Sequence, residues 1–374
     1  MTDFANWIEN PYRAYSGSNG NKKCLIHNNK MYMVKIFNTD DKTTEFTGAI
    51  SEHISCNIGR MLGLDCQKTE LGVYSFNNEN CWAVACEDFC NKNERLLEFS
   101  TIKNGIIDSS NEGQGKSLAN VLIGIENQKL IDAEELKKCF WDMFIFDALI
   151  GNFDRHPGNF GIIVNEEEQK ARIAPIYDCG STLFPGAMKD EKIMRDYLSN
   201  EKEQESRVYE YPRSALRDDN GKKINYFDYI FNGINADCTK ALLRITPRID
   251  IEKIRNFINN TNEITGLQKE FCCKVLESRK EKILDYCFSK FETKDLNFEL
   301  NKKGDNTFNL MMEKEKILIE NLDDLHGANK RYGELYIEEK NKSKEKFQFM
   351  LNSNTDVKIA IMMLKERYTK KRNS

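Results

Sequence analysis

The sequence predicts an α+β fold with two lobes, a small β-rich lobe followed by a larger and mainly helical one. Residues 1–90 carry four strand-like apolar runs with a single helical pattern between them. Residues 132–150 and 236–290 carry apolar side chains at three- and four-residue spacing, which is typical of helices. At 374 residues the chain is also too long for one simple core. We therefore expect an N-terminal lobe over 1–90, a helical lobe over 91–290 and a C-terminal extension over 291–374.

The N-terminal lobe is predicted as two strand pairs around one helix. Residues 23–37 form the first pair, and the two asparagines between its apolar halves tolerate the positive φ of a tight turn. Residues 45–61 repeat apolar side chains every three or four positions, which predicts a helix. Two further strand-like runs follow at 69–76 and 81–88. The expected order of elements is therefore ββαββ.

The second lobe is predicted to form around a long buried helix over 132–150, capped by Asp132. Two short strands follow in the runs FGIIV and RIAPIYD. Residues 186–225 are polar and charged, which favours a long loop or a mobile insertion. Three later stretches have helical patterns: 236–246, 250–260 and 264–290. Residues 291–374 are rich in Lys, Glu and Asn with scattered apolar residues, and we expect them to form a helical extension of unassigned role.

The composition narrows the class of protein. A net charge of -4 gives no electrostatic reason to expect direct binding of nucleic acid. The 12 cysteines include no CxxC pair, so neither a disulfide scaffold nor a zinc site is expected. No run of apolar residues is long enough to span a membrane, and the first residues lack the pattern of a signal peptide. We expect a cytoplasmic protein, with secretion or delivery into a host cell as the alternative.

The densest polar cluster, DRHPGN, follows directly after the most apolar helix. Asp154 and Asn159 stand five positions apart in a loop, where the Asp can accept a proton from a hydroxyl and the Asn oxygen can coordinate Mg²⁺. Protein kinases have the same separation in their catalytic loop. Asp178 follows at the end of an apolar strand, where a carboxylate is suited to hold a hard cation. A turn whose polar side chains cap backbone groups is the alternative for the loop alone, and Asp178 favours the catalytic interpretation.

A loop rich in Ser, Gly and Asn precedes the first strand. Its backbone amides and hydroxyls are suited to surround the phosphates of a nucleotide, although such runs are also ordinary connections. The residues are Ser16, Gly17, Ser18, Asn19 and Gly20. The run matches neither the dinucleotide-binding nor the P-loop pattern.

Three further positions fit a nucleotide site between two lobes. Lys35 stands in the second strand, where it either neutralises phosphates or lies on a solvated face of the sheet. Glu52 lies on the small-residue side of the following helix, which suits an inward carboxylate paired with Lys35. Glu45 competes for this role, but the helix dipole alone explains a carboxylate at a helix start. Glu87 and Phe89 end the fourth strand, where an adenine-binding hinge would lie.

The stretches LIGNFDRHPGNF and APIYDCGSTL resemble the signature of the HipA-like kinases, including the CtkA-like bacterial serine/threonine protein kinases. The run SEHISCNIGRMLGL and the strand MYMVK resemble the same family, and the resemblance covers roughly residues 11–290. It implies a bilobal protein-kinase-like fold that uses ATP and Mg²⁺. It also implies transfer of the γ-phosphate to a Ser or Thr hydroxyl of a protein substrate.

The resemblance also implies a role for each matched residue. Asp154 would be the catalytic base, with His156 ordering the catalytic loop. Asn159 and Asp178 would be the Mg²⁺ ligands. Lys35 would bind the phosphates and Glu52 would orient it. These assignments describe a complete kinase site.

Regulation and partners follow from the resemblance in the same way. A serine of the phosphate loop, Ser16 or Ser18, would be autophosphorylated. A HipB-like antitoxin partner is implied by the family, but nothing in this sequence supports one. Two alternatives to the protein-kinase interpretation stay open: a phosphoinositide-type lipid kinase, and a catalytically inactive ATP-binding module.

Overall fold

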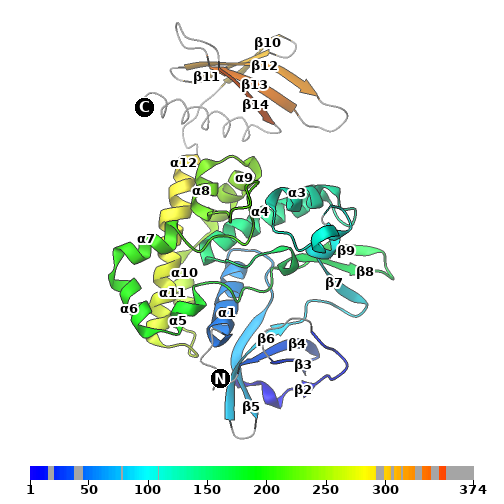
Figure 1. The fold of residues 1–374 in the computed structure, drawn as a ribbon, viewed down its shortest axis with the longest axis vertical. Helices are drawn as coiled ribbons and strands as arrows, with labels where there is room; N and C mark the ends of the chain where they lie inside the picture. The colour runs from blue at the N-terminus through cyan, green and yellow to red at the C-terminus, as the bar shows by residue number, and fades with distance from the viewer. Residues whose placement is uncertain are drawn as a thin grey trace. The chain divides into compact units, whose positions relative to one another are not determined.

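The computed structural model describes residues 1–15, 21–37, 45–76, 79–107 and 109–291, together with five strands between 299 and 350. The chain divides into two compact units, Met1–Phe288 and Ser289–Ser374. The first unit combines sheets with a larger set of helices (Figure 1). The predicted α+β class is therefore confirmed. None of the helices described is long and apolar enough to cross a membrane.

A six-stranded sheet with the order β1-β5-β6-β4-β3-β2 begins the chain. Its strands are β1 (Thr2–Asp3), β2 (Ile8–Glu9), β3 (Asn21–His27), β4 (Lys30–Phe37), β5 (Thr69–Phe76) and β6 (Glu79–Glu87). Asn28 and Asn29 join β3 to β4 with φ values of 48° and 60°, as the sequence predicted for a tight turn. Phe4, in a short 3₁₀ turn between β1 and β2, packs into the core of this sheet beside Leu25 and Val34.

Helix α1 (Glu45–Met61) connects the sheet to the rest of the unit. It has the predicted boundaries, and Gly63 follows it with a φ of 76°, in the left-handed region that favours glycine after a helix. Ile50, Ile54 and Ile58 recur at four-residue spacing and are fully buried. The helix lies between the six-stranded sheet and the helical lobe (Figure 1).

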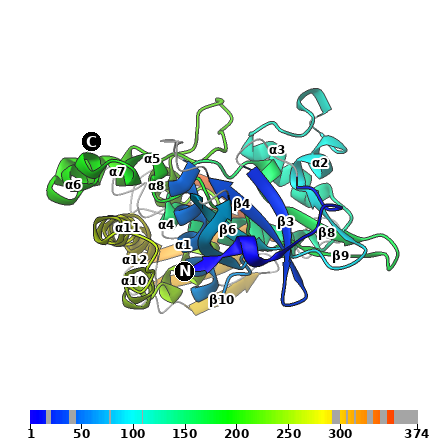
Figure 2. The same ribbon diagram turned by 90° about the horizontal axis from the view of Figure 1, so that it is seen from below.

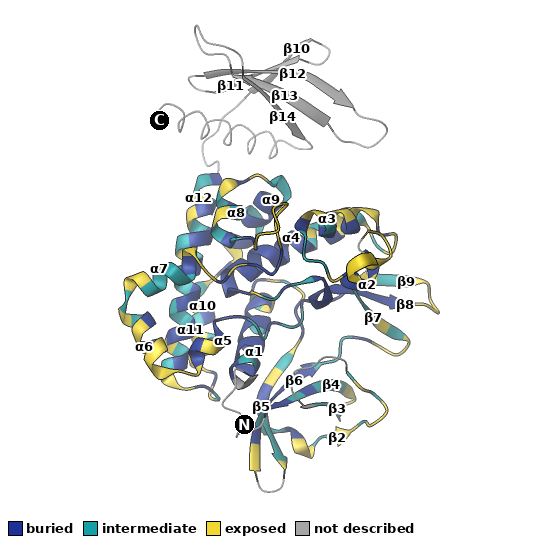
Figure 3. Ribbon diagram, in the orientation of Figure 1, coloured by how far each residue is buried: buried dark blue, intermediate teal, exposed yellow. Residues whose placement is uncertain are grey.

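The helical lobe is built around α4 (Ala133–Ile150). The Asp132 side chain accepts a hydrogen bond from the amide of Glu135 and caps the helix, as expected. Every residue from Phe140 to Ile150 is buried, so the second half of α4 has no solvent-facing side (Figure 3). Gly151 then ends the helix in the left-handed conformation with a φ of 64°. The polar loop therefore starts from a fixed point inside the core.

The other helices of this unit surround α4. They are α2 (Phe99–Asn104), α3 (Leu118–Asn127), α5 (Pro185–Met188), α6 (Glu191–Ser199), α7 (Glu201–Tyr209), α8 (Tyr226–Asn232), α9 (Ala236–Ile245), α10 (Ile251–Asn259), α11 (Gly266–Arg279) and α12 (Tyr286–Phe291). A π-helical segment, Lys280–Asp285, joins α11 to α12. Figure 2 shows α10 and α11 at one side of the unit and β8 and β9 at the other.

A second sheet, of three strands, begins where the polar loop ends. Its order is β7 (Glu94–Glu98), β8 (Gly161–Asn165) and β9 (Lys170–Ile173), all antiparallel. The loop after α4 runs directly into β8, and β9 leads toward Asp178. The predicted strand pair around an acidic turn is therefore present in part. The second strand ends at Ile173, so the prediction that Asp178 stands at the end of a strand is wrong, and Ile176 forms only an isolated bridge with Cys66.

The prediction of a long loop over 186–225 is wrong. The segment contains most of α5 and all of α6 and α7. The Asp190 side chain accepts hydrogen bonds from the amides at the start of α6, and Asn200 does the same for α7. Met194 and Tyr197 are the buried residues of α6. Each of these helices buries only a narrow apolar stripe, and their many charged residues made that stripe difficult to recognise in the sequence.

The prediction of helices over 291–374 is also wrong for the part that the structure describes. This part is an antiparallel five-stranded sheet in chain order. Its strands are β10 (Glu299–Gly304), β11 (Thr307–Met312), β12 (Glu315–Asp324), β13 (Arg331–Ile337) and β14 (Glu345–Met350). Short runs such as KFQFM alternate apolar and polar residues, and this two-residue period is typical of a strand.

Candidate functional site

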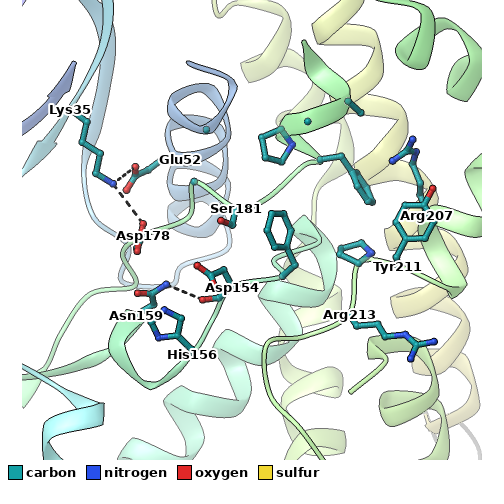
Figure 4. A pocket seen from close by; sticks show the side chains of 18 of the residues that line it. Lys35, Glu52, Asp154, His156, Asn159, Asp178, Ser181, Arg207, Tyr211 and Arg213 are labelled. Carbon is teal, nitrogen blue, oxygen red and sulfur yellow. Dashed lines mark hydrogen bonds and ion pairs between the residues drawn. The ribbon is translucent and has the colours of Figure 1, made fainter. Parts of the chain in front are cut away.

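One cavity of about 900 Å³ brings together six of the residues that the sequence singled out. Its walls come from β3, β4 and α1 and from the segments 153–159, 178–187 and 207–223. Six predicted residues line it: Lys35, Glu52, Asp154, His156, Asn159 and Asp178 (Figure 4). The fold therefore brings residues more than 100 positions apart in the chain into one site.

Lys35, on β4, joins two carboxylates inside this cavity. Its Nζ lies 2.6 Å from Glu52 Oε2 and 3.7 Å from Asp178 Oδ1 (Figure 4). Burial disfavours the charged ammonium, but Glu52 and Asp178 outweigh burial and raise the pKa of Lys35 above its ordinary value. The Lys35–Glu52 ion pair expected from the sequence is present, and Lys35 stays a cation over the physiological pH range.

Helix α1 approaches the segment after Asp178 closely enough to fix Glu52. A Cβ added to Gly48 would lie 3.5 Å from the carbonyl oxygen of Gly180, which is ordinary contact distance. One turn further along, Ser51 Oγ donates to the carbonyl of Thr182 at 2.7 Å. Small side chains on this side of α1 therefore let the helix dock, as the sequence predicted.

The polar loop after α4 is closed by its own hydrogen bonds. The Asn159 side-chain amide donates to the carbonyl of Asp154 at 2.9 Å, and Asn152 Oδ1 accepts from the amide of Asp154 at 3.0 Å. His156 Nδ1 accepts from the amide of Gly158 at 3.0 Å. Burial lowers the pKa of His156, which favours the neutral ring that this acceptor role needs. Asp154 is thus held from both sides with its carboxylate facing the cavity (Figure 4).

The buried Arg155 side chain contacts three parts of the site: helix α4, the polar loop and the segment that leads to Asp178. Its side chain is 2% exposed, and its Nε lies 3.1 Å from Asp147 Oδ2 on α4. The guanidinium also donates to the carbonyls of Asn159 and Tyr177. Burial disfavours its charge, but the Asp147 carboxylate outweighs burial and raises the pKa of Arg155. One buried cation therefore sets the position of the loop relative to α4 and to the segment that carries Asp178.

Two oxygen donors face the cavity in positions suited to a hard cation. The Asn159 amide nitrogen is bound to a carbonyl, so its Oδ1 is the atom left to accept or coordinate. The Asp178 side chain is 46% exposed, which leaves carboxylate oxygen accessible. Among the residues described, no group of three or more His, Cys, Asp or Glu side chains is arranged to hold a metal ion. The donor set fits Mg²⁺ completed by phosphate and water, and not a self-contained metal centre.

The segment of the chain that builds this cavity matches a known protein family. The family model described as the HipA-like C-terminal domain matches residues 20–241. The chain belongs to this family. The serine/threonine-protein kinase CtkA of Helicobacter pylori is 43% identical over 286 residues, which are 76% of this chain and 86% of that protein.

Solved structures agree with the family assignment. The crystal structure of a Helicobacter pylori proinflammatory kinase, CtkA, matches with a TM-score of 0.72 and 42% identity, covering 77% of this chain and 97% of the other. A Shewanella oneidensis HipA, solved with HipB and operator DNA, matches with a TM-score of 0.45 and 15% identity, covering 75% of this chain and 70% of the other. The CtkA structure confirms the fold expected from the sequence, and with the family model it confirms the expected family.

Two predicted site residues of this HipA-like chain lie outside the cavity. Glu87 forms ion pairs with Lys30 at 2.9 Å and Lys68 at 3.6 Å on the N-terminal sheet. Phe89 packs against Tyr177, with ring centroids 5.6 Å apart. Both residues lie at or just after the end of β6, where the chain passes to the second sheet, but neither lines the space that contains Asp154. The expected phosphate loop lies outside the described residues: Ser16, Gly17, Ser18, Asn19 and Gly20.

The sequence did not single out several residues that the structure places at the site. Asp147 is one of two acidic residues in the apolar second half of α4 and stands eight positions before Arg155, and this spacing was the available signal. Lys22 pairs across the hairpin with Lys35 in strand register and lines the same cavity. Burial and the charge of Lys35 lower the pKa of Lys22. No local pattern indicated the cations at the other end of the cavity, which come from α7 and the segment after it.

Proposed function

We propose that this HipA-like chain is an ATP-dependent serine/threonine protein kinase. It transfers the γ-phosphate of ATP to a Ser or Thr hydroxyl of a protein. The observation that carries the proposal is the shared cavity, in which Asp154 faces the same space as the Lys35–Asp178 pair. The relative CtkA, named as a serine/threonine kinase, supports the same class of reaction.

Phosphoryl transfer depends mainly on positioning and on stabilising charge. Lys35 brings a permanent positive charge to the phosphates, and Glu52, 2.6 Å away, holds the ammonium in place. Glu52 is 2% exposed, so water does not compete for this ion pair. Lys22 adds a second cation to the same end of the cavity.

The acceptor hydroxyl loses its proton to Asp154, whose backbone is fixed by Asn152 and Asn159. Asn159 Oδ1 and the Asp178 carboxylate would hold Mg²⁺, which supplies charge neutralisation for the phosphate oxygens when bound. Arg155 positions these groups without contacting substrate, because its guanidinium is buried among Asp147 and backbone carbonyls.

Autophosphorylation of Ser16 or Ser18 is part of the proposal and rests on the family resemblance. Mass spectrometry of protein incubated with ATP and Mg²⁺ tests it, and the single variants Ser16→Ala and Ser18→Ala separate the two positions. Phosphate on other residues alone would contradict it. An antitoxin-like partner stays a prediction.

Labelled ATP tests the main proposal. Wild type incubated with Mg²⁺ and a generic protein substrate transfers label, while Asp154→Asn and Asp178→Asn lose transfer. Asp196→Asn is the matched control, because Asp196 is an exposed carboxylate on α6 outside the cavity. ATP with Mg²⁺ also raises the Tm of the wild type.

Absence of both label and Tm shift would overturn the proposal. Label in phosphoinositide vesicles alone would favour a lipid kinase, and binding without turnover would favour an inactive module.

A further inference from the structure

The cavity continues past Asp154 into an end lined by cations and aromatic rings. This end contains Phe184, Arg207, Tyr211, Arg213 and Lys223. Arg207, Tyr211 and Arg213 lie on the far side of Asp154 from Lys35 (Figure 4). The carboxylates lining the described cavity are Glu52, Asp154 and Asp178, so none belongs to this end beyond Asp154 itself. This end is therefore net positive, whereas Lys22 and Lys35 at the other end are balanced by Glu52 and Asp178.

Arg207 is built into this end. Its guanidinium carbon lies 4.9 Å from the ring centroid of Phe184 and 5.4 Å from that of Tyr211. The side chain is 12% exposed, and the Glu203 carboxylate is 3.9 Å away. Within the described structure its buried Nε has no hydrogen-bond partner. Such a cation, stacked on rings and only weakly paired, keeps its positive field directed at the cavity.

The segment that carries Arg213 and Lys223 is anchored beside the Asp154 loop. Ser214 donates its amide to the carbonyl of Ile224 at 2.9 Å, which brings the neighbouring Arg213 and Lys223 to the same rim. Pro212 packs against Gly151 at the end of α4, where an added Cβ would lie 3.2 Å from its ring. The rim cations therefore keep a fixed distance from the start of the loop.

We infer that Arg207, Arg213 and Lys223 form a subsite for an acidic side chain of the protein substrate, close in sequence to the acceptor Ser or Thr. The inference rests on the proposed kinase function. An acceptor hydroxyl at Asp154 places the neighbouring peptide residues in the rest of the cavity, because the Lys35 end is taken by the nucleotide. Guanidinium and ammonium groups there recognise a carboxylate by charge and hydrogen bonding. Arg213 and Lys223 contact it at the rim, and Arg207 strengthens the field behind them.

A matched pair of peptides tests the subsite. Each has one central Ser, flanked within three positions either by Asp residues or by the isosteric Asn. Wild type prefers the Asp peptide by about ten- to a hundred-fold in kcat/KM, mainly through KM, as expected for hydrogen bonds to charged groups. The preference falls as salt is raised, because the rim is exposed and screened.

Variants of the rim make the test specific. Arg213→Ala with Lys223→Ala brings the preference close to one, and Arg213→Glu reverses it toward a peptide with Lys in place of Asp. Lys192→Ala with Arg195→Ala removes the same charge from exposed positions of α6 outside the cavity and keeps the wild-type preference. A rise in the KM for ATP with an unchanged peptide preference would overturn the inference, because the rim would then serve the nucleotide.

Peptide binding without ATP separates this inference from the proposed function. Fluorescence anisotropy with the labelled Asp and Asn peptides measures recognition in the absence of turnover. Tighter binding of the Asp peptide that is lost in the rim variant supports the subsite even if no peptide is phosphorylated. Equal binding of both peptides by the wild type, together with equal turnover, would exclude it.

Discussion

Arg155 and Asp147 form a buried ion pair beneath the polar loop, with Nε 3.1 Å from Oδ2 and both side chains no more than 2% exposed. The same guanidinium binds the carbonyl of Asn159 at 2.7 Å. The pair thus connects the end of the most buried helix to the residue proposed as a cation ligand. We therefore expect stability and catalysis to depend on the same contact.

Removing one partner of this pair is expected to destabilise the protein strongly. Asp147→Asn leaves a buried guanidinium without its counter-charge, and the free energy of unfolding falls by about 3–5 kcal/mol. Urea denaturation measures the change. Arg195→Ala is the control, because its pair with Glu191 is exposed at 68% and 78%, and we expect less than about 0.5 kcal/mol there. Equal losses in the two variants would contradict the role given to Arg155.

Lys35 and Glu52 are expected to affect catalysis unequally. Lys35→Met removes the phosphate-binding charge and lowers kcat/KM by about 10²- to 10³-fold. Glu52→Gln keeps the lysine but removes the carboxylate that holds its ammonium in place, so the decrease in kcat/KM is smaller. Steady-state kinetics with ATP and a protein substrate measure both. Lys68→Met, a change of an exposed lysine on the same lobe, keeps wild-type kinetics. Unchanged kinetics in Lys35→Met would contradict a role for Lys35 in binding the phosphates.

Asp178 is expected to determine the metal dependence. Asp178→Asn removes the negative charge of the one carboxylate proposed to hold Mg²⁺ and leaves only a neutral amide oxygen there, so any residual activity needs about 10- to 100-fold more Mg²⁺ for half-saturation. EDTA abolishes wild-type activity, and added Mg²⁺ restores it. Titration of Mg²⁺ at fixed ATP measures the shift. An unchanged half-saturation in Asp178→Asn would remove this residue from the proposed metal site.

His53 makes stability depend on pH. Burial lowers its pKa to about 4, while its Nδ1 lies 3.2 Å from Thr69 Oγ1. The unfolded chain, with an ordinary pKa near 6.5, binds the proton first, so stability is lost as pH falls from about 6.5 to 4. The contribution is about 3 kcal/mol. His53→Gln reduces the difference in unfolding free energy between pH 7 and pH 4.5. If the difference is not reduced, groups other than His53 cause the pH dependence of stability.

Gly161, where the polar loop enters β8, is expected to tolerate no side chain. A Cβ there would lie 2.4 Å from the carbonyl oxygen of Leu97 on the neighbouring strand, and backbone cannot move aside cheaply. Gly161→Ala therefore costs about 1–3 kcal/mol. Gly266→Ala is the matched control, because a Cβ at that helix start meets nothing within 4 Å. Thermal unfolding compares the two, and similar Tm values would refute the steric argument.

Local pattern was sufficient wherever neighbours in the chain decide the structure. The asparagines at 28 and 29 adopt the positive φ that their turn requires, and α1 runs from Glu45 to Met61 as its apolar spacing predicts. It was insufficient over 186–225, where two capped helices carry so much surface charge that their few buried residues gave no visible period. The strands between 299 and 350 were missed for a related reason, because their alternating runs are short.

The sequence alone was sufficient to predict which residues meet in the cavity: the DRHPGN loop, Asp178, Lys35 and Glu52 are indicated by type and spacing. Only the tertiary structure decided what holds and surrounds them. The ion pair of Arg155 exists only because α4 places Asp147 beside it, and Arg207 and Arg213 line the same cavity although they follow Asp154 by more than 50 residues. Such contacts depend on how whole elements pack. Packing is a property of the complete fold, so residue spacing does not encode it locally.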